Sequence, residues 1–363
     1  MVIMMSHATT PQSAVRGVWL TNVDSDVLTS KEKIEEAVSF CDSLGINSIF
    51  TVVWNKGLTL YPSRVAEEYL DAKIDPLYGD RDPLMELIQA AHKRNIKVFA
   101  WFEFGFASSY NENGGHILKK YPHWAAKDKH GNLATKNNFE WMNGFHPEVQ
   151  EFMLQLIAEV VTNYPVDGIQ GDDRLPAVPS LAGYDEYTVS RYQKQFGTMP
   201  PMNEKDSSWV QWRSDILTGF MGRIFEKVKS IKKDVIVSMA PSIFPWSKEE
   251  YLQDWVKWMQ LGYVELLCPQ VYRYSIEDYT SALSAIIREQ VPADQLHRFY
   301  PGVLLKVGNY HPEKQFLKEM IEANRANGIS GEVFFFYEGL KKFPLEFRNK
   351  FYNIPVTFPQ LLH

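Results

Sequence analysis

The chain has 363 residues, of which 45% are hydrophobic and 23% charged, and its formal net charge is −6. This is the composition of a folded protein with enough apolar material for a large core. The negative charge gives no electrostatic reason to bind nucleic acid or an anionic membrane, and no apolar stretch is long enough to cross a bilayer. Ten Trp and an aromatic content of 14% favour a carbohydrate site, because flat rings stack well on the faces of sugars.

The N-terminal stretch MVIMMSHATTPQSA predicts a flexible segment over residues 1–14. It has neither a basic beginning nor a continuous apolar stretch, so the sequence as written predicts a cytoplasmic location. If a signal has been removed, the location is periplasmic or extracellular. Residues 15–355 contain no Pro/Gly/Ser-rich linker and predict a single domain, whose oligomeric state is left open. Cys41 and Cys268 are expected to be buried thiols rather than a disulfide or a metal pair.

Eight short apolar runs alternate with longer amphipathic segments along the whole chain. They are rich in Val, Ile and Phe, as expected for parallel strands buried on both faces. The runs lie at residues 15–21, 46–54, 96–104, 166–172, 235–240, 263–272, 299–305 and 332–337. Eight strands alternating with helices predict an α/β fold of the (β/α)8 TIM-barrel type. An open doubly wound sheet is the competing architecture, and no G-x-G-x-x-G turn supports its dinucleotide-binding version.

Two connections are long, and several helix ends share a local pattern. The loop after strand 3 (residues 105–145) and the connection between strands 4 and 5 (residues 174–233) are predicted to be insertions over the barrel mouth. Elsewhere, helices give way to Gly or Asn and then Ile, as in SLGINSI, KRNIKVF and ANGISGEVF. Gly and Asn tolerate the left-handed conformation that ends a helix, so a new strand is expected after each.

Carboxylates stand at three of the predicted strand ends. The active site of a TIM barrel lies at the C-terminal ends of its strands, and there this sequence has Glu103, the pair Asp172 and Asp173, and Glu338. Glycoside hydrolysis needs one carboxyl group to protonate the leaving oxygen and another to act as nucleophile or to activate water. The sequence therefore predicts a glycosidase, although pairing with a neighbouring Arg or Lys is the competing interpretation of each single acid.

The alternation of side chains along the fourth strand distinguishes the two aspartates. Gln170 and Asp172 share one face, so Asp172 points into the barrel lumen if the polar Gln170 does. Asp173 is then expected to point towards the helices or to swing into the loop. Asp172 is the first choice for the catalytic carboxylate and Asp173 the second. Glu338 is predicted as the partner across the cleft, and Glu103, on the neighbouring strand, as the residue that tunes Asp172.

Other side chains near the strand ends are predicted to bind the sugar. Tyr272, Gln270 and Asn22 are expected to form hydrogen bonds with it, and tryptophans to stack on its rings. For tryptophans in buried strands, a core role is the competing interpretation. The predicted substrate-binding set is Trp19, Asn22, Trp54, Asn55, Lys56, Trp101, Arg174, Trp246, Gln270, Tyr272 and Tyr337.

Metal and nucleophilic chemistry lack their sequence signatures. His116, His123 and His130 are evenly spaced in the loop after strand 3, but the interval matches no zinc motif, so they are predicted to be solvated. The sequence has no G-x-S-x-G elbow and no P-loop. We therefore expect neither a metal nor a cofactor.

Five stretches, in order along residues 15–340, resemble a known family. They are RGVWLTNVDS, LGINSIFTVVWNKGLTLYPS, AAHKRNIKVFAWFEF, HPEVQEFMLQLIAEVVTNYPVDGIQGDDR and YVELLCPQVYRY. Together they resemble the bacterial glycosyl-hydrolase-like family 10 proteins (formerly domain of unknown function 187). The resemblance implies a (β/α)8 barrel acting on glycans, including peptidoglycan strands stripped of peptides. It matches Asp172 and Asp173 to the acidic pair of the family's fourth strand, and residues 269–272 to the P-Q-I-Y of its sixth.

The chain departs from that family pattern in three places. Arg174 replaces the usual aromatic residue after the acids, Glu103 stands where Asn is common, and Asn55 and Lys56 replace Arg-Pro. Because these residues line the predicted cleft, the family's substrate does not transfer directly. The stretch VDGIQGDDR also echoes the chitinase motif D-G-x-D-x-D-x-E. Gln170 and Arg174 stand where that motif has acids, which disfavours a substrate-assisted mechanism.

The sequence thus predicts a metal-independent O-glycosidase whose partner is an oligo- or polysaccharide, with an amino-sugar or peptidoglycan glycan as the narrower expectation. Two alternatives stay open. A non-catalytic glycan-binding barrel would have stacking aromatic residues without a close acid pair. An enzyme for small phosphorylated metabolites would need a phosphate nest after strands 7 and 8, for which LLKVGNY supplies one Lys and one Gly, and EGLKK a helix start.

Overall fold

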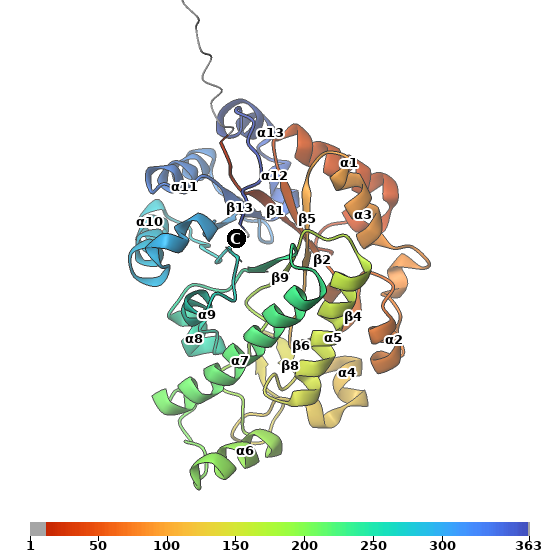
Figure 1. The fold of residues 1–363 in the computed structure, drawn as a ribbon, viewed down its shortest axis with the longest axis vertical. Helices are drawn as coiled ribbons and strands as arrows, with labels where there is room; N and C mark the ends of the chain where they lie inside the picture. The colour runs from red at the N-terminus through yellow and green to blue at the C-terminus, as the bar shows by residue number, and fades with distance from the viewer. Residues whose placement is uncertain (1–11, 362–363) are drawn as a thin grey trace, which may run out of the picture.

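Eight parallel strands form the centre of the protein, for which the computed structural model describes residues 12–361. The strands are β1 (Arg16–Leu20), β2 (Ser48–Val52), β5 (Lys97–Trp101), β9 (Gly168–Gly171), β10 (Ile236–Met239), β11 (Leu266–Leu267), β12 (Gly302–Leu304) and β13 (Glu332–Phe335). Their spatial order is β11-β10-β9-β5-β2-β1-β13-β12. Parallel bridges from Leu267 to Phe299 and from Gln270 to Gly302 join the two end strands and close the ring. The predicted TIM barrel is confirmed (Figure 1).

Helices follow every strand and surround the ring (Figure 1). They are α1 (Lys31–Ser43), α2 (Arg64–Leu70), α3 (Pro83–His92), α4 (Gly115–Lys120), α5 (Pro147–Asn163), α6 (Glu186–Phe196), α7 (Ser207–Ile231), α8 (Trp246–Tyr251), α9 (Trp255–Gln260), α10 (Ile276–Ala285), α11 (Lys314–Ala326), α12 (Tyr337–Leu340) and α13 (Pro344–Glu346). The helix ends follow the predicted pattern, because Gly45, Asn95 and Gly328 all have positive φ, at 76°, 56° and 76°.

A polar chain of hydrogen bonds crosses the barrel lumen. Trp19 Nε1, on β1, donates to Gln170 Oε1, on β9, over 2.6 Å, and Gln170 Nε2 donates to Ser238 Oγ, on β10, over 2.8 Å. Two strands separate β1 from β9 in the sheet, so the first bond spans the interior. Gln170 therefore points into the lumen, as the prediction for Asp172 required.

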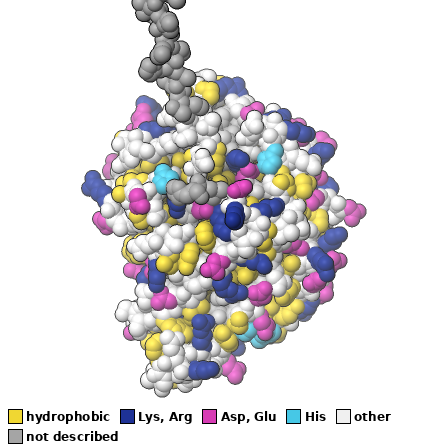
Figure 2. All heavy atoms as spheres, in the orientation of Figure 1, with side chains coloured by type: hydrophobic (Ala, Val, Ile, Leu, Met, Phe, Trp, Pro, Cys, Tyr) yellow, Lys and Arg dark blue, Asp and Glu magenta, His cyan; other side chains and the backbone are white. Residues whose placement is uncertain are grey.

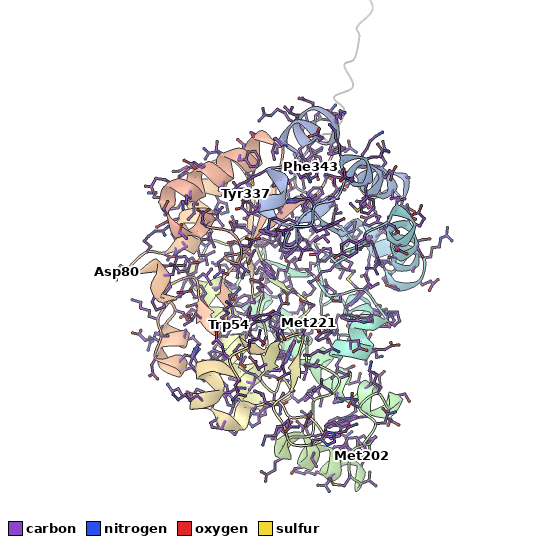
Figure 3. All side chains as sticks on the ribbon, turned by 180° about the vertical axis from the view of Figure 1, so that it is seen from behind. Trp54, Asp80, Met202, Met221, Tyr337 and Phe343 are labelled. Atoms are coloured by element: carbon purple, nitrogen blue, oxygen red, sulfur yellow. The ribbon has the colours of Figure 1, made fainter. Side chains whose placement is uncertain are left out.

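The two long connections contain secondary structure, and one of them is shorter than predicted. The loop after β5 folds into a small antiparallel sheet, and a hairpin follows β2. These strands are β6 (Ala107–Tyr110), β7 (Thr135–Lys136), β8 (Phe139–Trp141), β3 (Trp54–Asn55) and β4 (Leu58–Thr59). The prediction of an insertion over 174–233 was wrong for α7, which packs on α5 and α9 and belongs to the ring of barrel helices. The inserted part ends before α7, and the exposed Met202 lies at its tip (Figure 3).

The sixth strand is shorter than predicted. Regular pairing covers Leu266–Leu267 instead of residues 263–272. The chain nevertheless continues beside β10, because Cys268 N donates to Met239 O and Gln270 N donates to Pro241 O, just after β10. Short 3-10 or π segments complete the structure at Val27–Thr29, Pro76–Tyr78, Pro122–Trp124, Ile286–Gln290, Ala293–Arg298 and Phe347–Phe351. Cys41 and Cys268 are free and buried, as predicted.

The C-terminal segment runs across the N-terminal end of the barrel. Thr357 pairs with Ser13, and the Phe358 ring lies 6.0 Å from that of Phe99 on β5. Residues 1–11 of the predicted flexible segment lie outside the described residues. Figure 2 shows acidic and basic side chains interspersed over one face of the molecule. In the described part of the chain, no helix has the length and apolarity needed to cross a membrane.

Candidate active site

Asp172 follows β9 directly and is the most deeply buried of the four predicted acids, with no exposed surface. Its Oδ2 accepts hydrogen bonds from Trp101 Nε1 at 3.1 Å and Arg174 Nη2 at 2.8 Å, and its Oδ1 accepts one from the Arg174 backbone at 2.9 Å. Burial raises the pKa of Asp172, and the Arg174 guanidinium opposes that rise. In this conformation the Asp172 carboxyl group is held by the protein and does not meet solvent.

Arg174 links the acids to one another. Its Nη1 lies 3.1 Å from Asp173 Oδ1, and its Nε donates to the backbone oxygen of Glu103 over 2.6 Å. The guanidinium also lies over the Phe139 ring, 4.9 Å from its centroid. Burial lowers the pKa of Arg174, but the nearby carboxylates outweigh this effect and the net direction is upward. Arg174 therefore stays charged and fixes the geometry of the cluster.

Asp173 is the more accessible member of the pair. Its side chain is 22% exposed, against 1% for Asp172. Its Oδ1 accepts no hydrogen bond from any described residue, because the contact with Arg174 lacks hydrogen-bond geometry. The Oδ1 atom is itself buried, so the exposed surface of the Asp173 side chain belongs to its other atoms.

Two tyrosines lie within the electrostatic field of Asp173. Burial raises the pKa of Tyr251 to about 12, and the charge of Asp173 adds to the rise. The Tyr251 hydroxyl accepts a hydrogen bond from Asn137 Nδ2 at 2.9 Å. Burial also raises the pKa of the half-buried Tyr272, and the Asp173 and Asp172 charges reinforce the effect. Both phenols therefore remain protonated at neutral pH and able to donate hydrogen bonds.

Glu103 lies on the loop that follows β5 and is bound to neighbouring strand ends. Its Oε2 accepts from Asn55 Nδ2 at 2.7 Å and from Thr21 Oγ1 at 3.1 Å. Burial raises the pKa of Glu103, while the Arg174 charge opposes the rise. Gly105 permits this arrangement, because a Cβ there would lie 2.1 Å from the Arg174 carbonyl oxygen.

A mostly buried acid cluster thus lies at the C-terminal ends of the barrel strands. The sequence profile described as Glycosyl hydrolase-like 10 matches residues 14–308. The chain belongs to this family. The family resemblance seen in the sequence is therefore confirmed, and Asp172, Asp173, Arg174 and Glu103 form a candidate active site of a glycosyl hydrolase-like 10 protein.

Curated relatives of this glycosyl hydrolase-like 10 protein carry glycosyl hydrolase names. Glycosyl hydrolase DigH of Escherichia coli (strain K12) is 27% identical over 308 residues, which cover 73% of this chain and 67% of DigH. Glycosyl hydrolase YngK of Bacillus subtilis (strain 168) is 23% identical over 394 residues, which cover 96% of this chain and 73% of YngK.

Solved structures share the barrel fold. The PgaB (BpsB) glycoside hydrolase domain from Bordetella bronchiseptica has a TM-score of 0.68 at 14% identity, over 91% of this chain and 96% of that domain. The catalytic domain of a β-amylase from Paenibacillus polymyxa has a TM-score of 0.61 at 11% identity, over 91% and 94% of the two chains. At these identities the similarity establishes the fold alone.

Glu338, the predicted partner across the cleft, has other contacts. Its Oε1 accepts from Ser25 Oγ at 2.8 Å, and its Oε2 lies 2.5 Å from Nζ of Lys341, the residue that follows α12. The charges that act on Asp172 are instead those of Arg174, Asp173 and Glu103. The partner role of Glu338 stays a prediction, and the observed contacts favour Glu103.

The predicted tryptophans divide into buried and exposed ones. Trp19, Trp54 and Trp101 are 1%, 0% and 2% exposed. Trp54, for example, packs on Phe152 of α5 (Figure 3). The structure supports the core interpretation for these three, because a buried ring offers no face to a sugar. Trp246 is 43% exposed and lies 5.4 Å from the Tyr251 ring, so it remains a candidate for stacking.

The remaining predicted binding residues occupy different environments. Lys56 is exposed, and Asn22 and Gln270 are half-buried, with Gln270 Nε2 donating to the Ala240 carbonyl at 3.1 Å. These three stay predictions. Tyr337 is 5% exposed, and its ring packs on that of Phe40 of α1. Its predicted sugar contact is not supported, because α12 begins at Tyr337 and turns the side chain towards α1.

Sequence reasoning missed several members of the site. Tyr251 ends the short helix α8, Phe139 begins the short strand β8, and Asn137 lies in the turn before it, all outside the eight apolar runs that predict the barrel strands. Gln253 Nε2 donates to the Asp172 carbonyl at 2.7 Å. The aromatic residues in NNFEW and WSKEEY were the available signal. The three loop histidines are exposed, as predicted, and among residues 12–361 no group of His, Cys, Asp and Glu side chains is arranged to hold a metal ion.

Proposed function

We propose that this protein is an O-glycosidase that cleaves a polysaccharide, and that Asp173 is the carboxylate that meets the glycosidic bond. One observation carries the proposal: of two adjacent acids at a strand end, Asp172 is buried and bound by Arg174, whereas Asp173 is partly exposed beside Tyr251 and Tyr272. This reverses the preference drawn from the sequence, because a group without exposed surface cannot reach a substrate.

Glu103 is our candidate for the second carboxyl group that hydrolysis requires. A general acid must hold its proton near the working pH, and burial moves the pKa of Glu103 in that direction. Asp172 acts as a positioning residue, because it holds Arg174, which in turn contacts Asp173 and the Glu103 backbone. The half-buried Tyr272 is our candidate for a hydrogen bond to a sugar hydroxyl group, whereas Tyr251 is buried.

An extended glycan suits the exposed aromatic residues at the same end of the barrel. Trp246 follows β10, and Tyr274, which is 67% exposed, lies 4.9 Å from the Tyr310 ring on the loop after β12. Such rings stack on successive sugars of a chain. We take an amino-sugar glycan, including peptidoglycan strands without peptides, as the first substrate class to test.

The rival functions have less support. A non-catalytic glycan-binding barrel gives no reason for a buried acid cluster around Arg174. A phosphate nest after β12 and β13 is disfavoured, because Lys306 pairs with Asp24, and Glu338 places an acid in the first turn of α12.

A substrate panel tests the proposal. The protein is incubated with peptide-free peptidoglycan strands, chitin oligomers and a neutral β-glucan, with and without EDTA, and new reducing ends are counted. We expect release from the amino-sugar glycans at the same rate in EDTA. No release from any glycan would refute the glycosidase, and loss of activity in EDTA that added metal restores would refute metal independence.

A further inference from the structure

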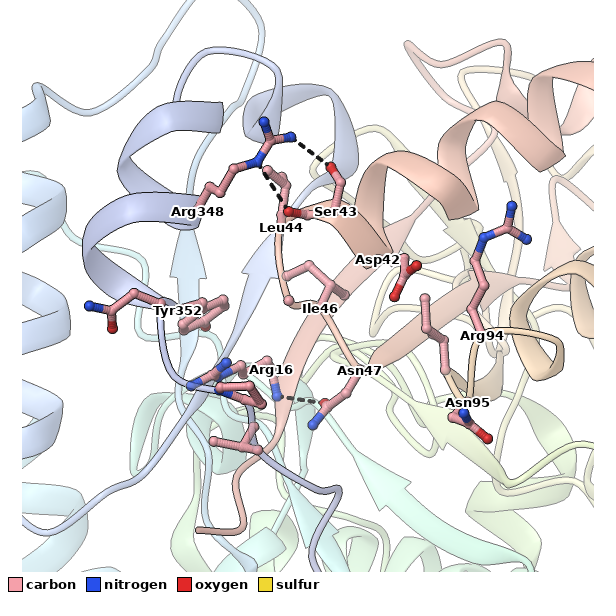
Figure 4. A pocket seen from close by; sticks show the side chains of 15 residues that line it. Arg16, Asp42, Ser43, Leu44, Ile46, Asn47, Arg94, Asn95, Arg348 and Tyr352 are labelled. Atoms are coloured by element: carbon pink, nitrogen blue, oxygen red, sulfur yellow. Dashed lines mark hydrogen bonds between the residues drawn. The ribbon is translucent and has the colours of Figure 1, made fainter. Parts of the chain in front are cut away.

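A polar pocket of about 400 Å³ lies at the N-terminal end of the barrel, opposite to the carboxylate cluster (Figure 4). It is formed by Arg16 at the start of β1, residues 42–47 at the end of α1 and before β2, residues 94–96 before β5, and the segment 348–356. Its volume lies within the range of about 300–1,000 Å³ that small-molecule sites occupy.

Arg16 is a buried residue whose guanidinium is not fully hydrogen-bonded within residues 12–361. The residue is 6% exposed, and its Nε is buried without an acceptor among residues 12–361. Its guanidinium lies over the Tyr352 ring, 4.2 Å from the centroid. The nearby acid Glu332 is already bound to Arg325 at 2.8 Å and to the Tyr352 hydroxyl at 2.5 Å. Burial also lowers the pKa of Arg16, which indicates that the surrounding charges compensate it incompletely.

The pocket carries an excess of positive charge. Arg16, Arg94 and Arg348 line it, whereas Asp42 is its single acidic lining residue, and Asp42 is exposed. Arg348 donates to Ser43 Oγ at 3.1 Å, so its charge is not neutralised there. Arg94 Nη1 lies 3.5 Å from Oε2 of Glu35, an acid of α1 that does not line the pocket.

Two segments at the ends of the chain contain no acid that could pair with Arg16. The lining segment 348–356 contains no Asp or Glu, and neither do residues 1–11, which precede the described part of the chain. A buried guanidinium nitrogen without an acceptor costs free energy, and a ligand carrying an anionic group would supply the missing hydrogen bond.

We propose that this pocket binds a small molecule with a carboxylate or phosphate group, with Arg16 as the residue that recognises the anionic group and Arg348 at the rim. Arg is suited to this role because its planar fork donates two hydrogen bonds to either group. The site lies at the opposite end of the barrel from Asp173 and does not depend on the proposed glycosidase activity.

Isothermal titration calorimetry tests the site with inorganic phosphate, citrate and glucose 6-phosphate, and with glucose as the neutral control, at constant ionic strength. We expect at least one anion to bind with a Kd below about 1 mM, and glucose not to bind. Comparison of phosphate, citrate and the sugar phosphate distinguishes an inorganic ion, a carboxylate and a larger phosphate ester as the source of the anionic group.

Matched variants locate the binding. Arg16→Met keeps the length of the side chain and removes the charge, and Arg348→Met does the same at the rim if the buried variant does not fold. Each is expected to weaken binding about tenfold or more, since a charge-assisted hydrogen bond is lost. Arg288→Met, at an exposed position outside the pocket lining, and Asp173→Asn should bind like the wild type.

Three outcomes would overturn the proposal: no anion binds, glucose binds as well as glucose 6-phosphate, or both pocket variants bind like the wild type. Loss of binding in Asp173→Asn would also overturn it, because the anion would then occupy the carboxylate cluster.

Discussion

Replacement of Arg174 by Met is expected to destabilise the fold strongly at neutral pH. The substitution removes a guanidinium that lies 2.8 Å from Asp172 Oδ2 and 3.1 Å from Asp173 Oδ1, while an aliphatic side chain still packs on Phe139. Asp172 has no exposed surface, so its charge would stay buried without a cation. Breaking a buried ion pair from one side costs about 3–5 kcal/mol. The Arg174 side chain is 15% exposed, so solvent screens the pair little.

Acidification should reduce this loss of stability. Without Arg174, the pKa of Asp172 in the folded protein lies further above its unfolded value of about 3.9. A raised carboxyl pKa costs stability at pH values above the folded pKa. The cost disappears below the unfolded pKa, where both states carry the proton. The deficit of Arg174→Met is therefore expected to be larger at about pH 7.5 than at about pH 4.5.

Urea unfolding followed by Trp fluorescence at the two pH values measures both effects. As a control, Arg64→Met removes an exposed ion pair with Glu68, whose side chains are 85% and 58% exposed, and should change stability by less than about 1 kcal/mol. If Arg174→Met is as stable as the wild type at neutral pH, or if its deficit grows in acid, Arg174 does not neutralise a buried acid cluster.

Three further substitutions probe burial near the site. Glu103→Gln should raise the free energy of unfolding at neutral pH, because burial raises the Glu103 pKa and the amide carries no charge. The gain should vanish below the unfolded pKa of about 4.3, and a loss at neutral pH in urea titrations would contradict it. Trp54→Ala should cost about 3–5 kcal/mol in the same titrations, and a cost under about 1 kcal/mol would refute its core role. Trp246→Ala should leave stability within about 0.5 kcal/mol but weaken retention on an immobilised glycan by up to about tenfold. Unchanged retention would exclude it from the binding surface.

The architecture could be predicted from the sequence because it rests on local patterns. Each of the eight apolar runs contains a strand, and helix ends at Gly45 and Asn95 have the left-handed conformation that their residue types favour. Local patterns did not show where the insertion between the fourth and fifth strands ends. The helix Ser207–Ile231 starts within a stretch that length alone assigns to a loop, and its packing on α5 makes it part of the barrel.

The membership of the site could be predicted better than its geometry. Strand alternation placed Gln170 in the lumen, but it does not say how far a side chain at a strand end is covered. Asp172 is covered because Arg174, Trp101 and Gln253 all donate to it, two of them from distant parts of the sequence. Such burial depends on tertiary contacts and not on periodicity.

Most of the residues that depart from the family pattern contact one another in the structure. Asn55 donates to the Glu103 carboxylate, and Arg174 donates to the Glu103 backbone, so three of the four residues that depart from the pattern form one hydrogen-bonded group. In the sequence they are separated by 48 and 71 positions, and only the barrel brings them together.

The most direct test compares the wild type with Asp173→Asn on the most rapidly cleaved glycan of the substrate panel. Asp80→Asn, an exposed acid at the periphery, is the matched control (Figure 3). The Asn variant keeps the shape of the side chain and removes the charge, so we predict a fall in kcat/KM of about 10²- to 10⁴-fold with no fall in the control. Turnover by Asp173→Asn close to that of the wild type would contradict the assignment of Asp173 as the carboxylate that meets the glycosidic bond.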